Sequence, residues 1–415
     1  MQKLFYVLAL VVVIGWAVSA ISTQTASKDD RVPVKTGIEV LLADKFDLIK
    51  GKRVGLITNP TGIASDLSSS IDRLVARPDV KLVALFGPEH GVRGDFDAGA
   101  HIETVVDTRT QIPLYSLYGQ IRKPTPEMLK NVDVLLYDIQ DIGCRSYTYI
   151  YTMAFAMEAA KEAGIPFVVL DRPNPLGGDL VEGPMLDLEY RSFIGYYPIA
   201  YVYGLTVGEL AALFNQEYGI GCDLTVVEMV GWERQMRFCD TRLPWVATSP
   251  HIPRALTALF YPTTGILGEL NTFNIGVGYT KPFELVAAPW IDAEELADEL
   301  NSRNLPGVRF RAAHYRPFYS HFQGELVHGV DIHIVLPEIF KPILTQVHIL
   351  TALQKLYPEQ PFFDTARSSS FDKAAGSDRL RQMVLEGRPA EEIIASWQAD
   401  LHDFEKIREK YLIYR

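Results

Sequence analysis

Residues 80–91 have the sequence VKLVALFGPEHG, in which an apolar run from Val80 to Phe86 breaks abruptly into a turn. The run is typical of a buried strand, and Pro88 cannot donate a hydrogen bond to a sheet, so we expect the strand to end there. The turn then carries Glu89 and His90 just past the strand, where open α/β sheets keep their functional groups. A single loop glutamate is often only solvated, so this turn by itself leaves Glu89 either a catalytic or a structural role.

Three further apolar runs share this character and alternate with segments of helical periodicity. The runs are Arg53–Thr58 (RVGLIT), Val132–Tyr137 (VDVLLY) and Phe167–Leu170 (FVVL), and helices are expected over Ser69–Ala76 and Thr152–Ala163. This alternation predicts an α/β fold with a parallel sheet and helices on both of its faces. The polar segments that follow the strands should therefore meet at one edge of the sheet.

The pattern changes in the second half of the chain. A helix is expected from Thr206 to Glu217, because Thr206 and Glu209 have the spacing of a capping box, which gives Glu209 a structural explanation. We predict a larger sheet domain over residues 37–218 and a smaller α+β domain over residues 219–415 that includes a helical C-terminal tail. The segments that indicate the smaller domain are Leu224–Met229, Phe283–Val286, Val330–Val335 and Ile343–Leu356.

The N-terminal segment has the features of a secretory signal. Lys3 precedes an apolar stretch from Leu4 to Ala17, and small residues follow it, so residues 1–20 are predicted to be a signal peptide and residues 21–36 a linker. No later segment is long and apolar enough to span a bilayer. We therefore expect an exported protein, periplasmic or secreted, without an integral membrane domain.

Charge and cysteine content narrow the classes of partner and cofactor. The net charge of −11 argues against nucleic acid, because such binding needs clustered lysine and arginine. Of three cysteines, Cys222 and Cys239 are able to pair in an oxidising compartment, while Cys144 would stay free. The sequence has no zinc-type Cys/His spacing and no glycine-rich phosphate loop after a strand, so we predict neither a metal nor a cofactor. The oligomeric state is left open.

The densest polar segment follows the strand Val132–Tyr137. It contains Asp141, Arg145, Tyr147 and Tyr149, residue types that suit a polyhydroxylated ligand because aromatic rings stack on sugar faces and charged groups bind hydroxyl or carboxylate oxygens. A self-satisfied polar network is the structural alternative. We predict a sugar-binding segment here.

Two other strand ends and one more acid add candidates. Asn59 begins the turn after Arg53–Thr58, and Asn174 stands between two prolines that stiffen its turn, although a purely structural turn is equally compatible with that pattern. Glu182 follows in VEGP and is the candidate for a second carboxylate. Glycoside hydrolysis usually needs a pair of carboxylates, one to protonate the leaving oxygen and one to act as base or nucleophile.

Five segments in the same order resemble the bacterial exo-β-N-acetylmuramidase family known as NamZ, over nearly the whole chain beyond the predicted signal. They are FGPEHGVRG at 86–94, YSLYG at 115–119, DIQDIGCRSYTY at 138–149, DRPNP at 171–175 and GLTVGEL at 204–210. The resemblance implies a Rossmann-like domain joined to a smaller auxiliary domain, with the active site in the cleft between them. It also implies release of terminal N-acetylmuramic acid from the non-reducing end of peptidoglycan fragments.

The resemblance carries over to individual residues. It makes Glu89 the catalytic residue, and we expect His90 to orient or tune it, with Glu182 as the second acid. The expected substrate contacts are Asn59, Arg93, Asp141, Arg145, Tyr147, Tyr149 and Asn174, of which Arg93 belongs to the first motif.

The sequence departs from this family in two places. Many members have EGTN followed by SEGRGT, where this chain has GELN at 268–271 and NIGVGY at 274–279, so Ile275 and Val277 replace an acid and an arginine. Val202 likewise stands where an arginine often precedes the GLT motif, and Tyr203 follows it. Because arginine is a natural partner for the lactyl carboxylate of muramic acid, these departures bear on the sugar more than on the reaction class.

The leading hypothesis is an exported glycosidase that acts on muropeptides through Glu89. An N-acetylated sugar can also supply its own nucleophile, which would leave Glu89 as the only essential acid. The alternatives are a non-catalytic exported binder of cell-wall sugars and a related hydrolase for another amino sugar.

Overall fold

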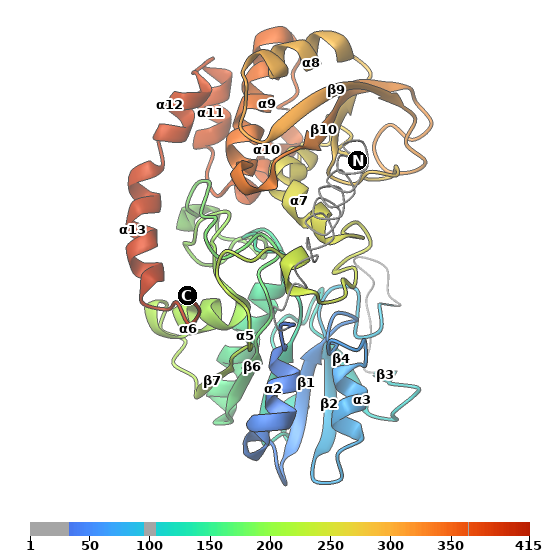
Figure 1. Ribbon diagram of the computed structural model, residues 1–415, viewed down its shortest axis with the longest axis vertical. Helices are drawn as coiled ribbons and strands as arrows, with labels where there is room; N and C mark the ends of the chain where they lie inside the picture. Colours follow the sequence, from blue (N-terminus) through green and yellow to red (C-terminus); the bar gives the residue numbers. More distant parts are fainter. Residues whose placement is uncertain (1–32, 95–104, 364) are drawn as a thin grey trace, which may run out of the picture. The chain divides into compact units, whose positions relative to one another are not determined.

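The structure, a computed structural model, describes residues 33–94, 105–363 and 365–415, and its elements carry the labels of Figure 1. The predicted signal segment, residues 1–20, and the linker up to residue 32 lie outside the described residues. Val34–Arg415 forms one compact unit that contains two sheets. Within the described ranges, no helix is long and apolar enough to cross a membrane.

The larger sheet has seven strands in the order β3-β4-β2-β1-β5-β6-β7. Its neighbouring strands are parallel except for β3 and β4, which pair antiparallel at one edge, so the predicted α/β fold is confirmed. Strand order reverses at β1, and the carboxyl ends of β1, β2 and β5 meet there. The strands are β1 (Arg53–Thr58), β2 (Lys81–Gly87), β3 (Val105–Val106), β4 (Pro113–Ser116), β5 (Val134–Asp138), β6 (Phe167–Leu170) and β7 (Leu224–Val227).

Helices cover both faces of this sheet, as the alternation predicts (Figure 1). On one face α2 (Gly37–Asp44) and α3 (Ser70–Val75) pack with the outward side chains of β1, β2 and β5. On the other face lie α5 (Tyr149–Ala163) and α6 (Val207–Glu217), with the short α4 (Pro126–Leu129) beside them. The predicted capping box of α6 is confirmed: Glu209 Oε2 accepts from Thr206 N at 3.0 Å, and Thr206 Oγ1 accepts from Glu209 N at 3.2 Å.

The smaller sheet is antiparallel and has the order β8-β10-β9. Two helices, α8 and α9, bury their apolar sides with this sheet in a core that continues into the α5 and α6 side of the larger sheet. The 14-residue α7 links the two sheets in the chain and contains Pro262. The elements are α7 (Ala255–Gly268), β8 (Leu285–Ala288), α8 (Ala293–Ser302), β9 (Val308–Tyr315), β10 (Val327–Ile334) and α9 (Pro342–Leu356).

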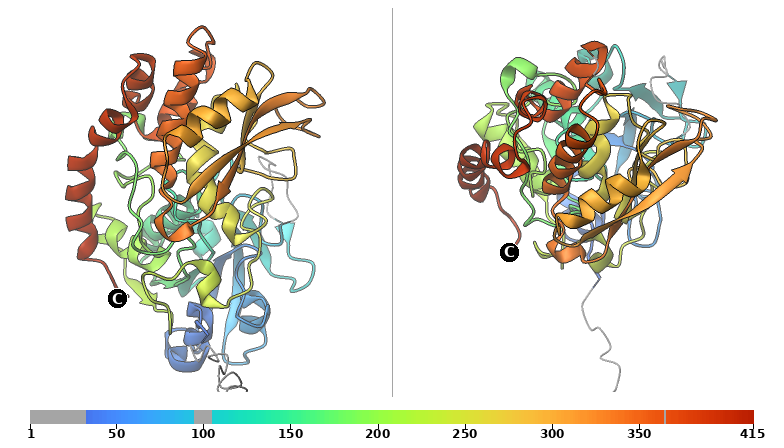
Figure 2. Two further views of the ribbon diagram at one scale, coloured as in Figure 1. Left: turned by 45° about the horizontal axis from the view of Figure 1, so that its top comes forward. Right: turned by 90° about the horizontal axis from the view of Figure 1, so that it is seen from above.

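The C-terminal helices run along one side of the molecule and bring the chain end back to the larger sheet (Figures 1 and 2). Beyond α13, the Tyr414 hydroxyl donates to Asp171 Oδ2 at 2.7 Å, and Lys410 bonds Glu217 of α6 at 2.9 Å. The C-terminal tail therefore also contacts the first half of the chain. These helices are α10 (Thr365–Ala375), α11 (Arg379–Leu385), α12 (Ala390–Ala395) and α13 (Gln398–Glu409); short 3₁₀ turns are η1 (Phe46–Leu48), η2 (Leu188–Tyr190), η3 (Phe238–Thr241) and η4 (Pro337–Ile339).

Two expectations need correction. The strand predicted at Leu224–Met229 was placed in the smaller domain, but β7 pairs in parallel with β6, so the larger sheet continues beyond residue 218. The pairing considered for Cys222 and Cys239 does not form: Cys222 is buried just after α6, whereas Cys239 is exposed on η3, and both thiols are free. The division of the chain into domains at residue 218 otherwise stays a prediction.

Candidate active site

The turn after β2 presents Glu89 at the carboxyl edge of the larger sheet. The strand ends at Gly87, and the turn closes through a hydrogen bond from Gly91 N to Pro88 O at 3.0 Å. His90 adopts a left-handed backbone conformation, with φ of 71°, which is uncommon for a residue with a side chain. Strain of this kind is often found at functional turns. Glu89, the residue before His90, is half-buried.

Two hydroxyl groups surround the Glu89 carboxylate. Thr148 Oγ1, at the residue before α5, donates to Glu89 Oε2 at 3.1 Å. The Tyr118 hydroxyl lies against the same carboxylate, and burial together with the Glu89 charge raises the pKa of Tyr118 to about 12. Tyr118 is therefore protonated at any physiological pH and keeps a proton to donate. The carboxylate is thus oriented from two separate strand-end segments.

Glu89 lines a cavity of about 380 Å³, a volume within the size range of small-ligand sites. Most of its wall comes from the second half of the chain, namely the end of α7, the segment that follows it, and the loop between β9 and β10. The lining residues are Glu89, His251, Tyr261, Gly265, Gly268, Glu269, Phe273, Asn274, Ile275, Val277, Phe283, Ser320 and His321.

Glu269 brings a second carboxyl group to this cavity. It follows the last residue of α7, and burial raises the pKa of its carboxyl group, while Arg367 at 3.7 Å acts in the opposite direction. Glu269 therefore retains its proton to a higher pH than an exposed glutamate does. This direction brings the pKa of the carboxyl group closer to the value that suits a proton-transferring group.

Three histidines lie at or near the same cavity. His251 and His321 line the cavity, and burial lowers the pKa of both imidazoles. His90 adds to the lowering of the pKa of His251, which places the two rings near each other. The Nδ1 atom of His90 is buried and finds no hydrogen-bond partner among the described residues. At neutral pH the rings of His251 and His321 are mostly uncharged and are able both to donate and to accept hydrogen bonds.

Arg145 does not face this cavity. It is fully buried, and its guanidinium donates to four backbone carbonyls: those of Pro184 (2.6 Å), Ile199 (2.9 Å), Ala374 (3.2 Å) and Ala375 (2.6 Å). The last two belong to α10, so this side chain ties the larger sheet to the C-terminal helices. These contacts support a structural role and give no support to the predicted sugar contact.

Asp141 and Asn174 are likewise bound to the protein, although Asp141 Oδ1 is buried without a hydrogen-bond partner among the described residues. Asp141 Oδ2 accepts from Gly143 N at 2.6 Å and from the Tyr203 hydroxyl, and burial raises the pKa of Asp141 to about 6. Asn174 donates to Leu205 O at 3.0 Å and accepts from Leu176 N at 2.9 Å. Both side chains close turns at the strand ends, and neither lines the cavity.

The predicted contacts Tyr147, Tyr149 and Asn59 form a layer behind the cavity wall. The Tyr147 hydroxyl donates to Thr248 Oγ1 at 2.7 Å and the Tyr149 hydroxyl to Thr248 O, while the Tyr147 ring packs edge-on, at 5.8 Å, against cavity-lining Tyr261. Asn59 Oδ1 accepts from Thr61 N at 3.0 Å and closes its own turn. These residues support the wall without lining it.

The remaining two predicted site residues lie elsewhere. Arg93 forms a two-point ion pair with Asp107, at 3.0 and 3.2 Å, and lowers the pKa of that buried carboxyl to about 2. Glu182 accepts from Ile343 N at 3.0 Å at the start of α9, and burial raises its pKa to about 7. Neither residue lines the cavity of Glu89, so the structure pairs Glu89 with Glu269 and not with Glu182.

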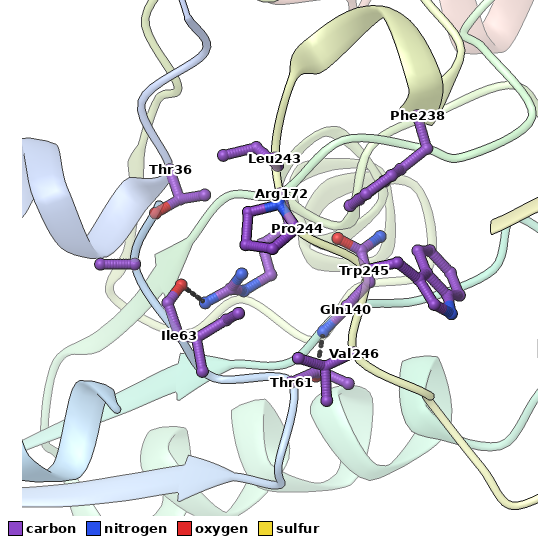
Figure 3. A pocket seen from close by; sticks show the side chains of 11 residues that line it. Thr36, Thr61, Ile63, Gln140, Arg172, Phe238, Leu243, Pro244, Trp245 and Val246 are labelled. Atoms are coloured by element: carbon purple, nitrogen blue, oxygen red, sulfur yellow. Dashed lines mark hydrogen bonds between the residues drawn. The ribbon is translucent and has the colours of Figure 1, made fainter. Parts of the chain in front are cut away.

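A second hollow lies nearby, between the β1 and β5 strand ends and residues 243–246 (Figure 3). Arg172 crosses it, with Nε at 2.6 Å from Asp138 and Nη2 donating to Ile63 O at 2.8 Å. Its free volume of about 10 Å³ is at most that of a single water molecule. It is thus an internal ion-pair site and not a place for a sugar. Among the described residues, no group of three or more His, Cys, Asp or Glu side chains could hold a metal ion.

Two family models match this chain, one in each half. The profile of the exo-β-N-acetylmuramidase NamZ N-terminal region matches residues 54–256, and that of the NamZ C-terminal region matches residues 259–414. The chain belongs to the NamZ family. The two matched regions meet at the start of α7, so Glu89 comes from the first region and Glu269 from the second.

Relatives match along most of the chain. The peptidoglycan β-N-acetylmuramidase NamZ of Bacillus subtilis (strain 168) is 53% identical over 391 residues, which is 94% of this chain and 93% of that protein. Two crystal structures of DUF1343 family proteins from Bacteroides fragilis NCTC 9343 have the same fold. One is 49% identical with a TM-score of 0.88, and the match covers 93% of this chain and 100% of that one. The other is 30% identical with a TM-score of 0.77, and the match covers 92% of this chain and 99% of that one.

One of the two departures from the NamZ pattern lies in the wall of this cavity. Ile275 and Val277, which replace an acid and an arginine, both line it. Tyr203, in the other altered segment, is buried and donates to Asp141. The sequence change therefore alters the surface that a ligand of Glu89 would contact.

Sequence reasoning missed Glu269, Tyr118 and Thr148 as parts of the site. Glu269 lies in the GELN segment at 268–271, whose departures from the family pattern gave a signal. Tyr118 belongs to the YSLYG motif and Thr148 to the 138–149 motif, so a signal existed for both. The sequence does not show that these hydroxyl groups contact Glu89.

Proposed function

We propose that this protein is an exported glycosidase that removes a terminal N-acetylmuramic acid residue from the non-reducing end of peptidoglycan fragments. The observation that carries the proposal is the cavity of about 380 Å³ in which Glu89 and Glu269 both stand, in a chain of the NamZ family. Paired carboxyl groups in one small cavity are what glycoside hydrolysis usually uses. The relative from Bacillus subtilis, 53% identical, is named for this activity.

The residues have distinct roles in the proposed reaction. Glu89, oriented by Thr148 and Tyr118, transfers a proton at the glycosidic oxygen, so that the bond from this oxygen to the anomeric carbon breaks. Water supplies the hydroxyl that ends on the anomeric carbon. Glu269 is the second carboxyl group. It assists the attack either of that water or, when the sugar supplies the nucleophile, of the acetamido group of the sugar.

Export is part of the proposal. Lys3 and the apolar stretch from Leu4 to Ala17 support a secretory signal, and peptidoglycan lies outside the cytoplasmic membrane. The test is N-terminal sequencing of the protein recovered from a cell fraction outside the cytoplasm. Recovery only from the cytoplasm, with Met1 retained, would contradict export.

The activity is tested with two chromogenic glycosides that differ only in the sugar, N-acetylmuramic acid and N-acetylglucosamine. We expect preferential hydrolysis of the muramide. Faster hydrolysis of the glucosaminide would indicate a hydrolase for another amino sugar. Binding of a muropeptide without any product would instead support a non-catalytic binder.

The assignment of the second carboxyl group has a matched pair of variants. Glu269→Gln should lower kcat/KM for the muramide by about 10²-fold or more, because one carboxyl group of the pair is lost. Glu182→Gln removes a more deeply buried acid that lies outside the cavity, so its kcat/KM should stay within about twofold of wild type, as for substitutions away from a site. The reverse pattern would return the second acid to Glu182.

A further inference from the structure

Beside the cavity, the loop between β9 and β10 exposes two aromatic side chains. Phe318 is 65% exposed and Tyr319 50%, and these are the two aromatic residues among the large exposed apolar side chains of the described chain. The next two residues, Ser320 and His321, line the cavity of Glu89. The aromatic pair therefore adjoins the cavity wall directly.

The backbone of this loop is held rigidly against the cavity segment. Phe318 N donates to Gly278 O at 2.7 Å, and a Cβ atom at Gly278 would lie 1.9 Å from Tyr319 O. Gly278, with φ of 87°, thus allows the two backbones to touch. The segment that is fixed in this way also carries Ile275 and Val277 of the cavity.

The two side chains are also fixed in orientation. The rings of Tyr315, Tyr279 and Phe318 form a series that runs from the buried strand β9 to the exposed loop. The ring centroids of Tyr315 and Tyr279 are 4.5 Å apart, and those of Tyr279 and Phe318 are 5.4 Å apart. The Tyr319 hydroxyl lies 3.1 Å from Nε2 of His251, which lines the cavity. These contacts restrict both rings before a ligand binds, which lowers the side-chain entropy cost of binding.

We propose that Phe318 and Tyr319 form a binding platform for the second sugar of the substrate, the N-acetylglucosamine ring that leaves when the terminal sugar is removed. This inference rests on the proposed function. In an exo-acting enzyme the terminal sugar occupies the cavity, and the rest of the glycan extends past its rim. A pyranose ring presents an apolar face of C–H groups that packs on exposed aromatic rings, and this pair lies at the cavity wall.

The test compares two substrates that share N-acetylmuramic acid but differ in the leaving group. One is the disaccharide with N-acetylglucosamine, and the other is the β-glycosyl fluoride, whose leaving group is a single atom. We expect Phe318→Ala to lower the ratio of kcat/KM for the disaccharide to kcat/KM for the fluoride by about fivefold to tenfold, as a lost aromatic contact does. Leu188→Ala, at a 54% exposed apolar residue on η2, is the matched control and should leave the ratio unchanged.

An unchanged ratio for Phe318→Ala would overturn the platform. A failure of the proposed function looks different, because wild type would then cleave neither substrate. Calorimetry of the Glu89→Gln variant keeps the platform testable in that case. Phe318→Ala in that background should weaken binding of the disaccharide more than binding of free N-acetylmuramic acid, and equal weakening of both would contradict the inference.

Discussion

The strand-end segments of the larger sheet and the cavity wall from the second half of the chain are both polar, but they use their polar groups differently. In the first, Arg145, Asp141 and Asn174 are buried and bound to the protein itself. In the second, Glu269 and His321 face an open cavity. The difference teaches that a dense polar segment after a strand is no guide to ligand binding until the partners of its side chains are known.

Substitutions in the two regions should therefore separate stability from activity. The buried side chains of Arg145, Asp141 and Asn174 at the strand ends should affect the free energy of unfolding and leave KM nearly unchanged. Side chains of the cavity should affect kcat/KM and leave unfolding nearly unchanged.

The largest stability effect is expected at Arg145. Arg145→Met would leave four buried backbone carbonyls without their donors, and each unsatisfied buried group costs about 1–3 kcal/mol. We expect the free energy of unfolding to fall by at least about 3 kcal/mol in urea denaturation. KM of the folded fraction should stay within about twofold of wild type, as for a change outside the site. A raised KM with unchanged stability would restore Arg145 as a sugar contact.

A smaller effect is expected at Asn174. Asn174→Ala removes two buried hydrogen bonds and orphans Leu205 O, so the free energy of unfolding should fall by about 2 kcal/mol. Thermal unfolding measures the loss. If Tm does not move and muramide hydrolysis slows, Asn174 contacts the substrate after all.

The smallest effect is expected at Glu182 and depends on pH. Its folded-state pKa of about 7 lies above the ordinary 4.5, so the folded state holds a proton that the unfolded state releases. Its contribution to stability is therefore full below pH 4.5 and declines as pH rises toward 7. Glu182→Gln should show a smaller fall in Tm between pH 5 and pH 8 than wild type. An identical fall in both proteins would contradict this linkage.

The sequence predicted the sheet well because the fold depends on local patterns. The runs at Arg53–Thr58 and Phe167–Leu170 became β1 and β6 with the same bounds, and the capping box at Thr206 formed as expected. The position of Glu89 followed from the same logic, since Gly87 and Pro88 end the strand. These features need only neighbouring residues to be known.

The rest of the site could not be predicted because it depends on distant partners. Arg145 has the residue type of a sugar ligand, but its carbonyl partners at Ala374 and Ala375 lie 229 and 230 residues away in the chain. Glu269 is likewise brought to Glu89 only by the packing of α7 beside the sheet edge. Composition of a segment indicates which chemistry it can perform, and tertiary contacts determine whether it does.

The most direct test of the account is the rate of Glu89→Gln on a chromogenic N-acetylmuramide, with the free energy of unfolding measured on the same sample. Glutamine keeps the shape and the hydrogen bond from Thr148 but cannot transfer the proton. We predict a fall in kcat/KM of about 10²–10⁴-fold, with the free energy of unfolding within about 1 kcal/mol of wild type. A rate equal to that of wild type would contradict the account, because the cavity would then not be where the glycosidic bond is broken.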